Sequence, residues 1–237
     1  MAVFRLDEIV RGSGLYTRRQ VIDLVNAGRV TVCGEAATAI SQRCDSEWDI
    51  RVDGVRVKMK PFVCIMMNKP AGYVTATESN KEPPVTQLLP EEYRHLFPVG
   101  RLDLDSEGLL LLTNDGNLCH RIIMPACGIP KLYYIEVSGT FVPDTAERFA
   151  AGIEVDNGLL CKPAAIEIAE DGRSAFVRIT EGKRHQVKRM AAAAGARVRY
   201  LKRLSIGGLE LDASLRPGEW RLLTEDEIQS IFVQDLP

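Results

Sequence analysis

The chain has 237 residues, of which 46% are hydrophobic and 26% are charged, and its formal net charge is −2 at pH 7. This composition is that of a globular protein with one or two domains. No apolar run approaches the ~18 residues that a membrane-spanning helix needs, and the acidic N-terminal segment does not resemble a secretion signal. A cytoplasmic protein with no membrane partner is therefore expected.

The six cysteines include no Cys-x-x-Cys pair, and the chain has three histidines. A zinc site would need clustered cysteine pairs, or cysteine with histidine at ligand spacing. The cysteines are therefore expected to be buried free thiols. Neither a metal nor a cofactor is expected.

The first 60 residues predict a small unit that begins with two helices. Apolar residues recur at helical spacing from Phe4 to about Gly12. Thr17 and Gln20 form a capping box for the second helix, which is expected to end at Gly28.

A short sheet is expected to complete this unit. Val30 and Val32 alternate as a strand, and Asp53-Gly54 between two alternating segments is typical of a tight hairpin. Pro61 marks a boundary. We therefore expect two domains, over residues 1–60 and 61–237.

The second domain is predicted to be rich in strands. The expected strands are Phe62–Met67, Gly108–Thr113, Lys131–Gly139, Ala164–Ile168 and Ala175–Thr180. The expected helices are Asp144–Ala151, Arg184–Ala194 and a last one capped at Thr224–Glu227. Strands with segregated helices indicate an α+β fold with a mostly antiparallel sheet.

The segment from Lys183 to Arg203 carries the strongest charge asymmetry in the chain, because it contains eight Lys and Arg residues and no acidic residue. A solvated helix face is one explanation, but such faces usually mix both signs of charge. A surface that binds nucleic-acid phosphates explains the pattern better.

The polar segment Phe97–Gly108 is expected to be a loop between apolar strands. Asp103 and Asp105 are two residues apart, so in an extended stretch both carboxylates project from one side. Such a pair suits a metal site, or one reactive carboxylate beside a structural one. On its own, the pair is more typical of turn and capping residues.

Four sequence blocks carry a family resemblance that gives this loop a purpose. They are Gly100–Gly116, Met67–Pro70 with Gly72–Val74, Lys131–Tyr133 and Glu181–Met190. Together, and in their order along the chain, these blocks resemble the bacterial ribosomal pseudouridine synthases related to the small-subunit (16S) rRNA enzyme. The similarity covers nearly the whole chain.

The N-terminal unit resembles the S4 RNA-binding domain. The matching segments are Arg5–Asp7, Arg18-Arg19, Gly28–Val30 and Val32–Gly34. The resemblance implies RNA contacts by Arg5, Arg18 and Arg19, and amides at the start of a helix also favour phosphate.

By the family resemblance, Asp103 is the catalytic nucleophile. Its carboxylate would attack the sugar or add to the base, and the residues do not decide between these routes. A nearby cation would keep Asp103 ionised. At ~100° per residue Lys188 lies at the edge of the apolar helix face and Arg189 points away, so Lys188 is the better candidate.

The resemblance implies a further pocket residue, Tyr133, whose ring would stack on the uracil and whose hydroxyl would help to move the C5 proton. Tyr134 should face the other side of the sheet. The remaining expected substrate contacts are Arg101, Arg184, Arg189 and Leu201, and the remaining RNA contacts are Lys183 and Arg203. His185 is expected to be structural or to face the RNA.

Two other functions stay open: a non-catalytic RNA-binding protein, and a magnesium enzyme that uses Asp103 and Asp105. The second lacks a third acidic ligand, because Asp115 is expected to serve an Asn114–Gly116 turn. The expected partner is ribosomal RNA or an assembling ribosomal subunit, bound by a monomer. We predict 16S rRNA as the substrate, with large-subunit rRNA as the alternative.

Overall fold

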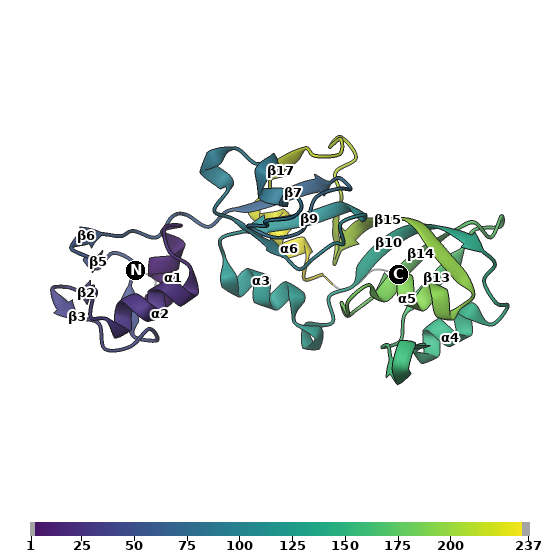
Figure 1. The fold of residues 1–237 in the computed structure, drawn as a ribbon, viewed down its shortest axis with the longest axis horizontal. Helices are drawn as coiled ribbons and strands as arrows, with labels where there is room; N and C mark the ends of the chain where they lie inside the picture. Colours follow the sequence, from purple (N-terminus) through teal and green to yellow (C-terminus); the bar gives the residue numbers. More distant parts are fainter. Residues whose placement is uncertain (1–2, 234–237) are drawn as a thin grey trace. The chain divides into compact units, whose positions relative to one another are not determined.

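The computed structural model describes residues 3–233, apart from the side chain of Asn157, and contains two compact units (Figure 1). The first unit ends at Val63 and includes Asn114–Gly116. The second comprises Cys64–Thr113 and continues from Asn117. No helix in the described part of the chain is long and apolar enough to span a membrane.

The first unit packs two helices against small sheets. Its elements are β1 (Val3–Arg5), α1 (Leu6–Gly12), α2 (Arg18–Asn26), β2 (Val30–Val32), β3 (Glu35–Ala36), β4 (Arg43–Asp45), β5 (Ile50–Val52) and β6 (Val55–Arg56). β1 pairs with β4, and the other strands form a sheet in the order β3-β2-β5-β6. The expected helix from Phe4 was wrong at its start, because Phe4 pairs with Cys44 as a strand.

Two local predictions in this unit are confirmed. The Thr17 side chain accepts a hydrogen bond from the Gln20 amide, and the Gln20 side chain accepts one from the Thr17 amide at 2.8 Å. Asp53 and Gly54 have φ values of 50° and 77°, the left-handed pair that a two-residue hairpin needs between β5 and β6.

The second unit is built on a nine-stranded sheet with the order β13-β14-β10-β15-β9-β7-β17. In addition, β16 pairs with β15, and β8 pairs with β9. The strands are β7 (Cys64–Lys69), β8 (Phe97–Val99), β9 (Glu107–Thr113), β10 (Lys131–Gly139), β13 (Ala165–Ile168), β14 (Ser174–Ile179), β15 (Ala196–Ile206), β16 (Leu209–Glu210) and β17 (Trp220–Leu222). Among these described strands β15 and β9 run parallel and the other pairs are antiparallel, which confirms the α+β class.

Helices and short turns complete the second unit. The helices are α3 (Gly116–Ile123), α4 (Thr145–Ala151), α5 (Gln186–Ala193) and α6 (Glu225–Ser230), and β11 (Glu154–Val155) pairs with β12 (Leu159–Leu160). The 3-10 turns are η1 (Val85–Leu88), η2 (Glu91–Tyr93), η3 (Pro125–Cys127) and η4 (Asp156–Gly158). The turn expected at Asn114–Gly116 was wrong in part, because Gly116 begins α3, which buries Leu118 and Ile122.

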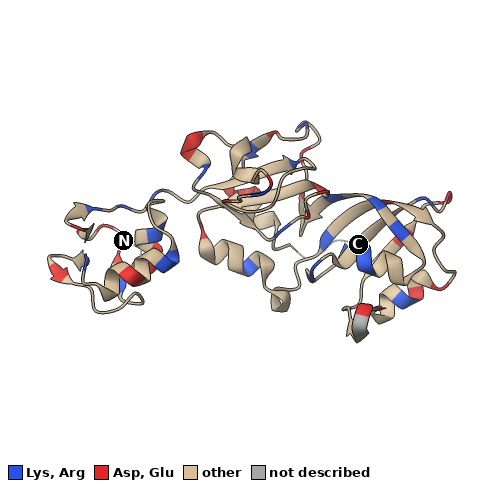
Figure 2. Ribbon diagram, in the orientation of Figure 1, with Lys and Arg blue, Asp and Glu red and all other residues tan. Residues whose placement is uncertain are grey.

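The central strands differ from those at one end of the sheet. All six residues of β7 are buried, as expected for a strand covered on both faces. On β14 the buried residues alternate with accessible ones. Helices α4 and α5 pack against this end of the sheet (Figure 1). Lys and Arg positions, blue in Figure 2, occur along its strands.

Candidate active site

Asp103 lies in the loop between β8 and β9, and its main chain is held by a buried lysine. Lys69 is 0% exposed, and its ammonium donates hydrogen bonds to the carbonyls of Pro70 (3.0 Å), Asp103 (3.1 Å) and Ser106 (2.8 Å). Burial lowers the pKa of Lys69 to about 8. The ammonium has three donors, so these carbonyls match its full capacity.

A buried threonine holds the residue before Asp103. The Thr75 hydroxyl donates to the Leu102 carbonyl at 2.7 Å and accepts from the Leu102 amide at 3.1 Å. The backbone on both sides of Asp103 is therefore fixed, while its side chain remains 31% exposed. Lys69 and Thr75 were not predicted from the sequence as site residues. The available signal for Lys69 was a charged residue soon after the apolar run Cys64–Met67.

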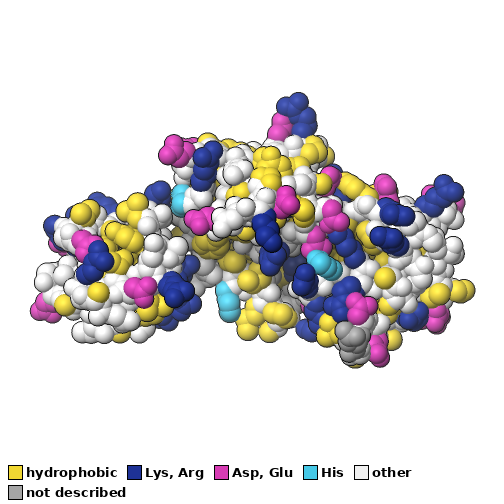
Figure 3. All heavy atoms as spheres, viewed as in Figure 1, with side chains coloured by type: hydrophobic (Ala, Val, Ile, Leu, Met, Phe, Trp, Pro, Cys, Tyr) yellow, Lys and Arg dark blue, Asp and Glu magenta, His cyan; other side chains and the backbone are white. Residues whose placement is uncertain are grey.

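The Asp103 carboxylate faces two basic side chains from the start of α5. Lys188 Nζ lies 3.4 Å from Asp103 Oδ2, and His185 Nε2 lies 3.5 Å from Asp103 Oδ1. Lys188 also bonds Asp105 Oδ1 at 2.5 Å, and this hydrogen bond lowers the pKa of Asp105. Figure 3 shows a histidine among acidic and basic side chains on the visible face of the second unit.

The side chain of Lys188 thus points inward, as the helical pattern predicted, and serves two carboxylates at once. A nearby ammonium favours the ionised form of a carboxylate. His185 is brought to Asp103 by a left-handed backbone conformation (φ 52°, ψ 29°) at the residue before α5. Non-glycine residues seldom adopt this conformation, so its presence beside the carboxylate marks a constrained site.

Tyr133 and Leu201 lie on the buried face of the sheet. Their exposed fractions are 7% and 5%. On β10 and β15, Tyr133 is opposite Arg203 and Ile135 is opposite Leu201, so all four side chains share one face. Arg203 in turn pairs with Gly108, five residues after Asp103.

The predicted surface contact between Arg203 and RNA is wrong. Arg203 is 2% exposed, and its Nε donates to the Leu109 carbonyl at 2.7 Å. Arg203 lies near Lys69 and Lys131. Burial is the main cause of the lowered pKa values of these two lysines, and the positive charge of Arg203 lowers them further. The sheet register places this side chain inside the protein, where it cannot contact phosphates at the surface.

The other expected contact residues of this unit fall into two groups. Arg189 pairs with Asp156 at 2.8 Å, and Lys183 donates to the Leu160 carbonyl at 2.6 Å. These two cations therefore tie the α5 region to the β11–β12 hairpin. Arg101 and Arg184 are exposed, and no described residue forms an ion pair with either.

The first unit contains the other three expected RNA contacts. Arg5 and Arg18 pair with the buried carboxylate of Asp7, at 2.8 and 3.7 Å. Arg19 is exposed on the first turn of α2. Unlike Arg5 and Arg18, Arg19 forms no ion pair with a described residue.

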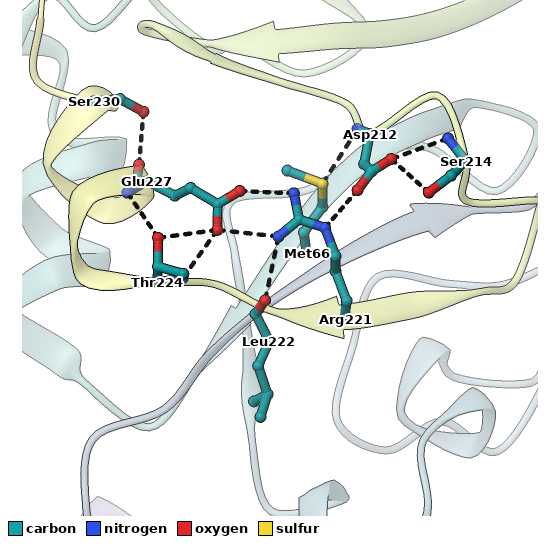
Figure 4. A network of polar contacts seen from close by, with 8 residues as sticks. All are labelled: Met66, Asp212, Ser214, Arg221, Leu222, Thr224, Glu227 and Ser230. Carbon is teal, nitrogen blue, oxygen red and sulfur yellow. Dashed lines mark hydrogen bonds and ion pairs between the residues drawn. The ribbon is translucent and has the colours of Figure 1, made fainter.

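A second charge cluster of the second unit is formed by residues 212–227 (Figure 4). Arg221 donates to Asp212 at 2.6 Å and to both carboxylate oxygens of Glu227 at 2.7 and 3.0 Å. Glu227 also closes the predicted capping box with Thr224 at the start of α6, which is thereby confirmed. Hydrogen bonds, chiefly from Arg221, lower the pKa of Glu227 to about 2.

In residues 3–233 no group of three or more His, Cys, Asp or Glu side chains is placed to hold a metal ion. Asp103 and Asp105 instead share the ammonium of Lys188. The arrangement combines an accessible carboxylate, a fixed backbone and an adjacent cation. Such a group can act as a nucleophile or as a proton acceptor.

Comparison with known proteins identifies the family. The family described as RNA pseudouridylate synthase matches residues 63–193. An RNA pseudouridine synthase of Bacillus subtilis (strain 168), described as uncharacterized, is 42% identical over 230 residues, covering 94% of this chain and 96% of that protein. Ribosomal small subunit pseudouridine synthase A of Escherichia coli (strain K12) is 40% identical over 210 residues, covering 87% of this chain and 90% of that protein.

A solved structure agrees with these sequence relatives. The crystal structure of a pseudouridylate synthase superposes with a TM-score of 0.71 at 33% identity, covering 96% of this chain and 99% of that one. Similarity of this extent includes both the sheet and the loop that carries Asp103. The chain therefore belongs to the RNA pseudouridylate synthase family of isomerases.

Proposed function

We propose that this protein converts one uridine of small-subunit (16S) ribosomal RNA to pseudouridine, with Asp103 as the nucleophile. The observation that carries the proposal is the 3.4 Å approach of Lys188 to an accessible Asp103 on a loop held by Lys69. The reaction breaks the bond from uracil N1 to the sugar, rotates the base and joins C5 to the same sugar carbon. The proton on C5 must then leave.

Each residue of the site has a distinct task in this proposal. Lys188 keeps the Asp103 carboxylate ionised, so that it attacks the sugar carbon or adds to the base. Tyr133 stacks on the uracil, and its hydroxyl assists removal of the C5 proton. Leu201, on the same sheet face, packs the floor of the pocket.

The RNA must be held while the uridine leaves its stack. Flipping a base costs a few kcal/mol, which contacts in the site offset. Arg101 and Arg184 are exposed and unpaired within residues 3–233, so we assign them to the phosphates beside the flipped nucleotide. We further propose that residues 1–60 act as an S4-like RNA-binding domain, with Arg18 and Arg19 on phosphates and Arg5 alongside.

The choice of small-subunit RNA is supported by the names of several relatives. Proteins called ribosomal small subunit pseudouridine synthase A from Yersinia pestis and Escherichia coli (strain K12) are 39% and 40% identical to this chain. Large-subunit RNA remains the alternative substrate. Mapping pseudouridine in both ribosomal RNAs from cells with and without the protein distinguishes the two.

The test of the nucleophile is the substitution Asp103→Asn, which keeps the size of the side chain and removes its charge. We expect the rate of pseudouridine formation to fall at least ~10³-fold, with RNA affinity and the melting temperature unchanged. Asp156→Asn is the matched control, because Asp156 pairs with Arg189 on the same helix. If the Asp103→Asn protein still forms pseudouridine, Asp103 is not the nucleophile. If the wild-type protein forms no pseudouridine in any ribosomal RNA, the result supports a non-catalytic RNA-binding protein.

A further inference from the structure

One end of the large sheet presents an open aromatic surface. On β10 and β14, Tyr133, Ile135 and Val177 are buried on the face that α4 and α5 cover. The alternate residues point the other way. Phe176 on that opposite face is 43% exposed, although large apolar side chains usually seek burial.

Three aromatic rings from three neighbouring strands meet on this face. The ring centre of Tyr134 lies 5.6 Å from that of Phe176 and 6.3 Å from that of Tyr200. The tyrosine hydroxyls are anchored, because Tyr134 donates to Glu136 at 3.3 Å and Tyr200 donates to Glu107 at 2.8 Å. The cluster therefore presents rings in set orientations.

Basic side chains surround the three rings. Lys202 is opposite Tyr134, and Arg178 is opposite Leu132 in the next row of the same face. Arg197 and Arg199 contribute two more cations at the Ser138 end, where Arg199 Nε donates to Ser138 at 2.9 Å. Figure 2 marks in blue the Lys and Arg positions along these strands.

Three acidic residues also lie on this surface. Glu136 and Glu107 accept the tyrosine hydroxyls, and Glu167 pairs with Phe176 from the edge strand β13. A carboxylate that accepts a hydrogen bond from a neutral hydroxyl keeps its negative charge, so four cations face three carboxylates on this surface. It is therefore the combination of exposed rings with the flanking cations Lys202 and Arg178 that suits a strand offering both bases and phosphates.

The aromatic surface also adjoins the loop of Asp103. In the register of the parallel strands β15 and β9, Lys202 lies opposite Glu107. Glu107 is the first residue of β9 and lies four residues after Asp103. This face is the one opposite to that of Tyr133, so a strand of RNA whose flipped nucleotide reaches Asp103 continues onto it by passing around the start of β9 at Glu107. Cross-strand aromatic pairing alone stabilises a sheet, but it requires neither the four cations nor the exposure of Phe176.

We propose that the face formed by Tyr134, Phe176, Tyr200, Arg178 and Lys202 binds a single-stranded segment of the RNA next to the modified uridine. Unpaired bases stack on exposed rings, whereas the bases of a duplex are already stacked on one another. Lys202 and Arg178 pair with the phosphates between those bases. The proposal rests on the proposed function for the identity of the RNA.

The test compares Phe176→Thr with Phe176→Tyr, using a labelled 16S RNA fragment with and without its single-stranded flanks. Threonine suits a strand but removes the ring, so affinity for the flanked RNA should fall ~10-fold, and tyrosine should retain it. The maximal rate at saturating RNA should not change. Leu222→Thr on β17, another exposed apolar residue, is the matched control and should bind normally.

Lys202→Gln tests the phosphate contact separately. The slope of log affinity against log salt should decrease by about one, while Arg148→Gln on α4 should leave it unchanged. The proposal is overturned if RNA affinity and its salt slope are unchanged in both Phe176→Thr and Lys202→Gln. It is also overturned if these substitutions change the oligomeric state without changing RNA affinity. If Phe176→Thr does not fold, photocrosslinking of wild-type protein decides: crosslinks on β10, β14 or β15 support the face, and their absence overturns it.

The two proposals can fail independently. A wild type that makes no pseudouridine but loses RNA affinity on Phe176→Thr would leave the RNA-binding face standing without the enzymatic assignment. An active enzyme whose RNA affinity ignores both substitutions would retain the assignment and remove the face.

Discussion

The second unit contains two clusters of charged side chains, one around Arg221 and one around Asp103, which differ in how completely their carboxylates are hydrogen-bonded. In the Arg221 cluster the guanidinium is matched to two carboxylates, and Ser214 and Thr224 supply further hydrogen bonds to them. In the Asp103 cluster the nearest side-chain nitrogens, those of Lys188 and His185, lie 3.4 and 3.5 Å from the carboxylate. A carboxylate with its acceptors filled stabilises the fold, whereas one held only loosely by a shared ammonium remains able to react.

The strongest test of this difference is removal of the ammonium at the Asp103 cluster. We expect Lys188→Met to reduce the catalytic rate ~10²-fold, because Asp103 and Asp105 lose their shared cation, while Lys188→Arg retains part of the rate. Single-turnover kinetics measure this directly. Arg189→Met, on the next residue of α5, is the control and should keep most of the activity; equal losses in both variants would contradict a special role for Lys188.

Lys69→Met should affect both stability and activity. Methionine is similar in length but leaves three carbonyls without their donor, so the free energy of unfolding should fall by about 3 kcal/mol. Urea unfolding measures this loss, and the rate constant should fall in the protein that remains folded, because the Asp103 carbonyl is released. Lys131→Met provides the comparison, because its ammonium bonds one carbonyl, that of Ile129; a larger loss there would argue against the role of the Lys69 contacts.

Arg221→Met should behave in the opposite way to Lys188→Met. The Arg221 cluster is partly exposed, so we expect the free energy of unfolding to fall by about 1 kcal/mol. Below the melting temperature the rate of pseudouridine formation should equal that of the wild type. A rate that falls in step with stability would show that the two clusters are not independent.

The smallest expected effect is on the pH dependence of stability. Arg221 lowers the folded-state pKa of Glu227 to about 2, so its stabilisation is complete above the unfolded value of about 4.3 and is lost as the pH falls towards 2. The stability difference between wild type and Glu227→Gln should therefore shrink from pH 5 to pH 2.5. Urea unfolding at several pH values tests this, and a difference that grows as the pH falls would reverse the sign of the argument.

Local sequence signals predicted much of the secondary structure. The bounds of β10 agree with the prediction, and the capping boxes at Thr17 and Thr224 form as expected. β15 was not predicted as a strand, because its four cations in eleven residues resembled a surface segment. Once paired between β10 and β9, that strand places Arg203 on the buried face.

The amino-acid sequence by itself determined the capping boxes at Thr17 and Thr224, the hairpin at Asp53-Gly54, the α+β class and the family, because each depends on neighbouring residues or on the order of short motifs. The tertiary structure decided which charges meet. Lys69 and Asp103 are separated by 34 residues, and Asp105 and Lys188 by 83. Only strand pairing and the packing of α5 bring such distant groups within hydrogen-bonding range, and only burial makes the ammonium of Lys69 seek three carbonyls in place of water.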